Sequence, residues 1–474
     1  MNAVSKPSEI DVSCRLPLLV LFISGAIWLV IGSVFALLAS LTFHKPDLFS
    51  NSFTFTYGHL VAVRTTAFLY GAGIQLGLAT TIWLFCRLGR TLLVQRILVT
   101  VGAAVWNLGV TVGVIGILVG DATGFDGLDM PGYAALIAFL GYLVVAIFAV
   151  LTLHERREPA LYVSQWFLLA ALFWFPWIFA TANLSLVVFP VRGVTQAIIA
   201  WWFSANLQIV WFGLVGLGAI FYFVPKLTNR QLNSHYLALF TFWTLILFAS
   251  WIGVPNSAPV PSWVPALSTV GSVLTLIPVI TFALNLHATV EGKYSILTAN
   301  LVSKFVLVGT FAFVVASVLN TIGSLFQVSQ ITDLTWFVPA KAQLNSYGFF
   351  AMVMFGAAYY IVPQLFGTEF PAPKLIKAHF WLATIGIVLI VLPLAAGGIV
   401  QGQLLNNPSN AFLSVTKTAL MFLRLSTLGD LLIFLGHLAF AFNVIGLVRQ
   451  YYAARAAELI AAATAEIGPS GAKA

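Results

Sequence analysis

Twelve long apolar segments limit this chain to one kind of fold. A helix of about 20 apolar residues crosses the hydrocarbon layer of a bilayer, and only helices and closed barrels satisfy their backbone hydrogen bonds there. The first segment is longer than the apolar part of a cleavable signal peptide and has no convincing cleavage site. We therefore predict an all-α, polytopic membrane bundle with about twelve spans, at 16–43, 60–85, 95–120, 133–153, 166–189, 196–223, 236–253, 263–286, 304–326, 344–363, 378–400 and 426–448.

The composition agrees with a membrane protein and argues against a nucleic-acid partner. Hydrophobic residues make up 60% of the chain and charged residues 8%, whereas soluble domains carry about 25% charged residues. The net charge is +8, but the basic residues are scattered over short loops and form no patch. We expect the lipid bilayer, and not nucleic acid, to surround this protein.

The basic residues also predict orientation. Of the 22 Lys and Arg, 16 fall on one side of the predicted spans and 6 on the other. The side rich in Lys and Arg is the cytoplasmic side, so both termini are expected there. We expect a cytoplasmic N-terminal segment (1–15), a single transmembrane domain (16–452) and a cytoplasmic tail (453–474) that begins as a frayed helix and is partly disordered. Cys14 and Cys86 fall on the cytoplasmic side and are expected to be free thiols.

Four motifs carry a resemblance to a known family: WWFSANLQ (201–208), GAIFYFVPK (218–226), AAYYIVPQLFG (357–367) and AHFWLATIGIVL (378–389). Together they resemble subunit I of the haem–copper oxidase superfamily, and more narrowly that of cbb3-type cytochrome c oxidases. The resemblance extends from the second to the twelfth predicted span. It implies the subunit I fold, a place in the respiratory chain of a bacterial inner membrane, and haem b with copper as cofactors.

That family uses six histidines, because neutral imidazole binds both iron and copper well. Two ligate a low-spin haem from opposite faces, one ligates a high-spin haem, and three hold copper beside it. The family motif Trp-Trp-Tyr-Gly-His-Asn reads WWFSAN here, which places Ala205 at a copper-ligand position. The family motif Leu-His-Thr reads Val-Arg-Thr, which places Arg64 at a low-spin haem position.

The remaining family positions are also changed. The His-His pair that completes the copper site falls among Pro255, Asn256 and Ser257, and the redox-active tyrosine aligns with Ala249. The motif Gly-His-Val-His, whose histidines bind the two haems, aligns with 340–343 and places Lys341 and Gln343 at the ligand positions. A guanidinium or an ammonium has no lone pair to offer a metal. We therefore expect no bound cofactor, no metal and no catalytic residue.

Seven histidines remain, and we predict that they do not form a replacement site. Only His437 lies within a predicted span, and His379 opens the eleventh span at its cytoplasmic edge. The others fall in loops or near helix ends, namely His44, His59, His154, His235 and His287. The pattern is typical of surface or interfacial histidines.

Other charged residues allow two interpretations each. Arg64 and Lys341 either extend to water at the outer ends of their helices or line a polar cavity in place of the haems. Asp430, the one acidic residue in a predicted span, either pairs with Arg424 or caps a helix turn, or acts as a proton relay. The loop that contains Asp121, Asp126 and Asp129 is either a solvated acidic loop or a cation site.

Three functions are compatible with these observations. The first is a haem-free, copper-free structural or docking subunit of a respiratory membrane complex, beside a c-type cytochrome or another respiratory subunit. The second is an active, proton-translocating terminal oxidase with haem b and copper. The third is a transporter or channel that reuses the bundle, for which the spans show no pair of broken helices.

Overall fold

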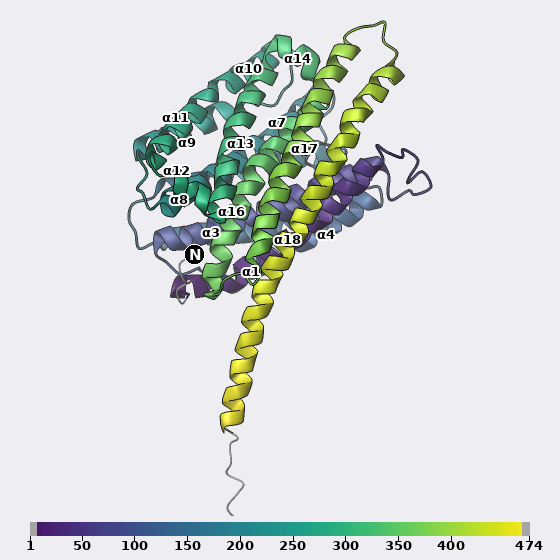
Figure 1. Cartoon of the computed structure of the whole chain (residues 1–474). Helices are drawn as coiled ribbons and strands as arrows, with labels where there is room; N and C mark the ends of the chain where they lie inside the picture. Colours follow the sequence, from purple (N-terminus) through teal and green to yellow (C-terminus); the bar gives the residue numbers. More distant parts are fainter. Residues whose placement is uncertain (1–6, 467–474) are drawn as a thin grey trace, which may run out of the picture.

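The chain is a bundle of long helices joined by loops (Figure 1) in the computed structural model, which describes residues 7–466. The described α-helices are α1 (Glu9–Leu41), α2 (Tyr57–Thr66), α3 (Gln75–Gly89), α4 (Arg96–Leu118), α5 (Gly132–His154), α6 (Val163–Asn183), α7 (Val194–Ala205), α8 (Phe212–Thr228), α9 (His235–Ala249), α10 (Trp263–Leu274), α11 (Leu276–Val290), α12 (Tyr294–Ala299), α13 (Leu301–Ser324), α14 (Phe326–Thr332), α15 (Phe337–Gln343), α16 (Met352–Phe366), α17 (Pro373–Leu405) and α18 (Phe412–Glu466). Four π-helical segments interrupt them: η1 (Ala67–Ile74), η2 (Leu184–Val188), η3 (Asn206–Trp211) and η4 (Leu344–Ala351).

The predicted membrane bundle is confirmed. Within residues 7–466, eleven helices are long and apolar enough to cross a membrane. The seventh predicted span differs, because α9 has only 15 residues and rises about 22 Å at 1.5 Å per residue. The loop that follows contains prolines at 255, 259 and 261, which disfavour helix there.

The last helix is longer than predicted. Helix α18 begins at Phe412 and continues through Glu466, a length of 55 residues. The helix predicted at the start of the tail, from residue 453, is the continuation of α18, and the end of the predicted tail, 467–474, lies outside the described residues. Figure 1 shows the C-terminal part of α18 extending beyond the other helices. This part is rich in Ala with Glu and Arg, which are strong helix formers.

Three spans form the centre of the bundle. In the most apolar windows of the spans at Tyr57–Gly89, Val194–Thr228 and Phe337–Phe366, 94%, 89% and 89% of the residues are buried, against 39–50% in the other eight. A helix that is apolar all round belongs in a protein interior. All three central spans contain a π-helical segment and a family ligand position, and the residues at these positions, Arg64, Ala205, Lys341 and Gln343, are half-buried.

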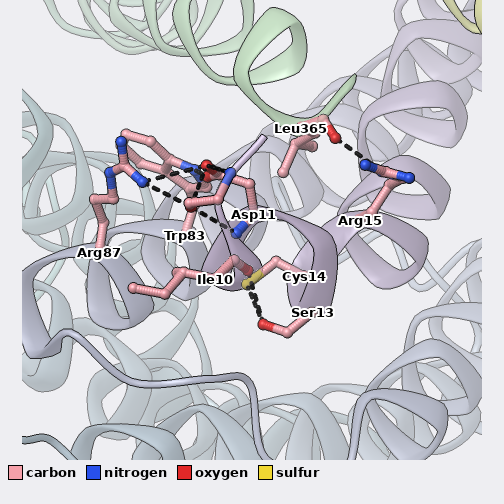
Figure 2. A network of polar contacts seen from close by, with 9 residues as sticks. Ile10, Asp11, Ser13, Cys14, Arg15, Trp83, Arg87 and Leu365 are labelled. Carbon is pink, nitrogen blue, oxygen red and sulfur yellow. Dashed lines mark hydrogen bonds and ion pairs between the residues drawn. The ribbon is translucent and has the colours of Figure 1, made fainter. Parts of the chain in front are cut away.

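A polar network surrounds the start of α1, at one end of the bundle (Figure 2). The Asp11 carboxylate accepts hydrogen bonds from Trp83 Nε1 at 3.1 Å, from an Arg87 guanidinium nitrogen at 3.2 Å and from Ser8 Oγ at 2.6 Å. Arg15 donates to the carbonyl of Leu365 at 2.8 Å. These contacts fasten α1 to α3 and α16. Cys14 and Cys86 lie buried nearby as free thiols, as predicted.

Candidate functional site

Four of the family ligand positions lie in the helical turns that lead into π-helical segments, whereas Pro255, Asn256 and Ser257 lie in the loop after α9. Arg64 is in α2, three residues before η1, and Ala205 is the last residue of α7, directly before η3. Lys341 and Gln343 end α15, directly before η4. A π-helical turn carries an extra residue and is frequent at functional sites. These four positions are therefore carried by three central helices, each of which changes its winding just after them.

Arg64 and Gln343 face one cavity, which we call cavity B. It measures about 230 Å³, and Asp430, Tyr347 and His437 also line it. The rings of Phe68 and Tyr347 stack in its wall with centroids 5.0 Å apart. The pockets that proteins offer to ligands usually measure about 300–1,000 Å³. Aromatic side chains thus take up part of the space between the two positions.

Two further cavities share a wall around Lys341. Cavity A measures about 550 Å³ and is lined by Ala205, Trp201 and Asn320, among others. Cavity C measures about 270 Å³ and is lined by Pro255, Asn256 and Asp333, among others. Lys341 lines both cavities. The family's copper positions and one haem position therefore line adjoining cavities, and cavity A also shares Asp126, Gln208 and Ala342 with cavity B.

The polar residues at the copper positions are engaged with the protein. Asn256 Nδ2 donates to the carbonyl of Ser324 at 2.8 Å and to Ser329 Oγ at 3.1 Å. Ser257 Oγ donates to Asp333 Oδ2 at 3.3 Å. These side chains hold the loop after α9 against α13 and α14.

Gly253 lines cavity A next to Ala205. Its φ is +121°, a conformation that other residues rarely adopt. A β-carbon on Gly253 would lie 2.5 Å from the β-carbon of Ala205 and 2.8 Å from the carbonyl oxygen of Trp201. The loop after α9 thus approaches α7 as closely as backbone atoms allow.

Comparison with known proteins identifies the family. The family model described as "Cytochrome C and Quinol oxidase polypeptide I" matches residues 17–432. The chain belongs to this family. Its recognition as a relative of haem–copper oxidase subunit I, which the motifs predicted, is confirmed.

Relatives place the chain near the cbb3-type branch. It is 26% identical over 423 residues to the cbb3-type cytochrome c oxidase subunit CcoN1 of Stutzerimonas stutzeri, covering 86% of this chain and 89% of the relative. It is 25% identical to a cytochrome c oxidase subunit 1 homolog of Agrobacterium tumefaciens, covering 88% and 80%. A nitric oxide reductase polypeptide of Stutzerimonas stutzeri is 28% identical over 54% of each chain.

The residues present do not fit the family's six-imidazole set of ligands. None of the residues that line cavities A and C is a histidine, and His437 is the one histidine that lines cavity B. Within residues 7–466 no group of three or more His, Cys, Asp or Glu side chains is placed to hold a metal.

Two histidines correct the expectation of surface positions. His379 lies six residues inside α17 and is fully buried, not at the cytoplasmic edge, and its Nδ1 lies 3.0 Å from the hydroxyl of Tyr359. His437 is also buried, with Nδ1 3.4 Å from the hydroxyl of Tyr347. Four others are exposed and His59 is half-buried, as expected. The two buried imidazoles are thus part of the core around α16.

Arg64, Lys341 and Asp430 all face cavities. Arg64 and Lys341 are half-buried, and Asp430 lies in cavity B with Arg64. The predicted pairing of Asp430 with Arg424 is wrong, because Arg424 Nε donates to the carbonyl of Phe43 at 2.9 Å. The two described ion pairs, Arg87–Asp11 and Arg90–Glu158, are both at the other end of the bundle.

The acidic loop between α4 and α5 covers this end of the bundle. Asp121 and Asp126 are exposed and Asp129 is half-buried. Asp126 lines cavities A and B, and Ser204 Oγ donates to it at 3.3 Å. Burial raises the pKa of Asp129 to about 7, with a further contribution from the charge of Asp126, whereas the backbone N–H groups of Asp129 and Gly127 oppose the shift.

This shift predicts that ionisation of Asp129 destabilises the fold. Between about pH 4 and pH 7 the folded state binds more protons at this carboxyl than the unfolded state does, so the free energy of unfolding falls as pH rises through that window. We expect Asp129→Asn to raise the apparent melting temperature of detergent-solubilised protein at pH 8 and to have less effect at pH 5. Asp121→Asn, at an exposed carboxyl, is the control. An equal effect of Asp129→Asn at both pH values would contradict the assignment.

Proposed function

We propose that this chain is a haem-free and copper-free member of the subunit I family that acts as a structural or docking subunit of a respiratory membrane complex. The observation that carries the proposal is that the positions where the family needs imidazole hold a methyl group, two cations and amides. Arg64 and Lys341 are the decisive residues, because each places a positive charge where a metal cation would have to bind.

Retention of the scaffold supports a role for the shape of this protein. The central helices keep their apolar surfaces and their inner-end motifs, while the ligand positions have changed. A chain without selected function would accumulate polar residues in these buried helices as readily as at the ligand positions. We infer that a partner, for which a c-type cytochrome or another respiratory subunit is the natural candidate, recognises the folded bundle. We place it in the bacterial inner membrane with both termini in the cytoplasm.

The second candidate is an active terminal oxidase, and the names of the relatives favour it. Four of them are called cytochrome c oxidase subunit 1 or its homolog, and one is a cbb3-type subunit. An active oxidase with haem b and copper would need ligands other than the six expected histidines. His437, in the wall of cavity B, is the one imidazole available there.

Haem and copper content distinguishes the two candidates. We expect protein purified in mild detergent to give no pyridine haemochrome spectrum and no copper above background by mass spectrometry. The cbb3-type subunit of Stutzerimonas stutzeri, expressed and purified in parallel, controls for haem supply and for losses during purification. Stoichiometric haem b in this protein would overturn the proposal and favour the oxidase. If the protein is haem-free, peroxidase staining of co-purified proteins after electrophoresis tests for a c-type cytochrome partner.

A further inference from the structure

The ammonium group of Lys341 has no direct partner among the described residues. It belongs to neither described ion pair, and no hydrogen bond from Nζ is present within residues 7–466. Its one described cation–π contact is with the ring of Phe337, whose centroid lies 5.6 Å from Nζ. A charge withdrawn from bulk water is costly unless a counter-charge or hydrogen-bonding groups compensate it. Lys341 therefore presents an incompletely compensated positive charge to cavities A and C.

Asn320 supplies a second donor at the same place. It lies on α13 and lines both cavities together with Lys341. Its amide makes no hydrogen bond in the part of the chain that the structure describes, in contrast to Asn345, whose Nδ2 donates to the carbonyl of Gln208 at 2.6 Å. A lysine and an asparagine without other hydrogen-bond partners among the described residues thus line the same two cavities.

The neighbouring acids limit the charge that this space favours. Asp126 lines cavity A and Asp333 lines cavity C. Burial raises the pKa of Asp333, while the Ser257 backbone N–H and the charge of Lys341 oppose that shift. Lys341 is the one cation among the residues that line the two cavities, and each carboxylate repels every negative charge of a ligand. A doubly charged group such as phosphate is therefore disfavoured relative to a singly charged one.

The walls suit a ligand with a small apolar part. Trp201, Ile209 and Val338 line both cavities. Cavity A, at about 550 Å³, is within the usual size range of ligand pockets. A carboxylate has one negative charge and two acceptor oxygens, one for the ammonium and one for the amide.

We propose that cavities A and C bind a monocarboxylate, whose carboxylate is held by Lys341 and Asn320 and whose apolar part lies against Trp201, Ile209 and Val338. This inference rests on the proposed function, since a haem in the same space would exclude the ligand. It gives the degenerate site a binding role that is independent of electron transfer.

Equilibrium dialysis of the purified full-length protein against radiolabelled butyrate at pH 7, in sulfate buffer, tests the proposal. We expect saturable binding that unlabelled butyrate displaces and the neutral isostere butyramide does not. Palmitate distinguishes the source of the carboxylate: stronger competition than butyrate indicates a fatty acid from the membrane, and weaker competition a soluble acid. No saturable binding, or equal displacement by butyramide, would overturn the proposal.

Variants distinguish the effect of losing the Lys341 charge from a general loss of folding. Lys341→Gln is expected to weaken butyrate binding about tenfold or more, as for loss of a charge-assisted hydrogen bond, and Lys341→Arg to keep most of it. Asp333→Asn is expected to tighten binding, because it removes a like charge. Lys417→Gln, at an exposed lysine of α18, is the matched control. Haem measured in the same samples keeps the two proposals apart: haem-free protein without butyrate binding contradicts only this inference.

Discussion

Replacement of Asp11 by Asn is expected to lower the apparent melting temperature of the solubilised protein by several degrees. Asp11 is 2% exposed and accepts hydrogen bonds from Ser8, Trp83 and Arg87. Removing one member of a buried ion pair costs about 3–5 kcal/mol, because the remaining charge is left uncompensated. The Arg87 side chain is 35% exposed, so water takes over part of its solvation and the expected cost is about 2–4 kcal/mol.

Fluorescence-detected size-exclusion chromatography after heating measures this effect. Glu158→Gln is the matched control, because it breaks the ion pair with Arg90, whose side chains are 75% and 43% exposed; exposed pairs contribute about 0–1 kcal/mol. The assignment of Asp11 as the fastening point of α1 fails if both variants melt at the same temperature as the parent.

Replacement of Gly253 by Ala is the second large expected effect. The backbone at φ +121° disfavours any side chain, at a cost of about 1–3 kcal/mol. The new β-carbon would also lie 2.5 Å from that of Ala205, and such overpacking costs about 1–3 kcal/mol. We expect a clear fall in the melting temperature and a displaced loop after α9.

A double-variant cycle separates the two contributions. Ala205→Gly removes the atom that the new methyl group would meet but leaves the backbone conformation unchanged. It should therefore restore part of the stability lost in Gly253→Ala and not all of it. Gly292→Ala, with φ +72° and no atom within 4 Å of the added methyl group, reports the cost of conformation alone. Equal melting temperatures for Gly253→Ala and Gly292→Ala would show that the contact with Ala205 is unimportant.

The sequence was sufficient to predict the bundle because length and apolar composition decide whether a helix can cross a bilayer. It was less informative where polar residues occur inside helices. The tenth span was predicted to begin at 344, since Lys341 and Gln343 lower the local hydropathy, yet the helix begins at Phe337. For the same reason Lys374 and Lys377 concealed the first turn of α17, and His379 was placed at an edge and not in the core.

The sequence predicted which residues occupy the family ligand positions but not which of them line the same cavity. Motifs identified Arg64, Ala205, Lys341 and Gln343 one helix at a time. Which of them share a cavity depends on side chains from helices far apart in sequence, such as Asn320 on α13 and Asp430 on α18. Asn320 had no local signal that would distinguish it from any other polar residue near a helix end.

The π-helical segments have a consequence for how such a protein can change. The extra residue in a π-helical segment changes the rotation, about the helix axis, of the segment before it relative to the segment after it. Loss of a single residue from η1 would return the segment to α-helical winding and swing Arg64 by about 100° around the helix axis, while the inner half stayed in register. The parts of these three helices that precede η1, η3 and η4 can thus change the residues that they present to the cavities while the packing of the parts that follow stays the same.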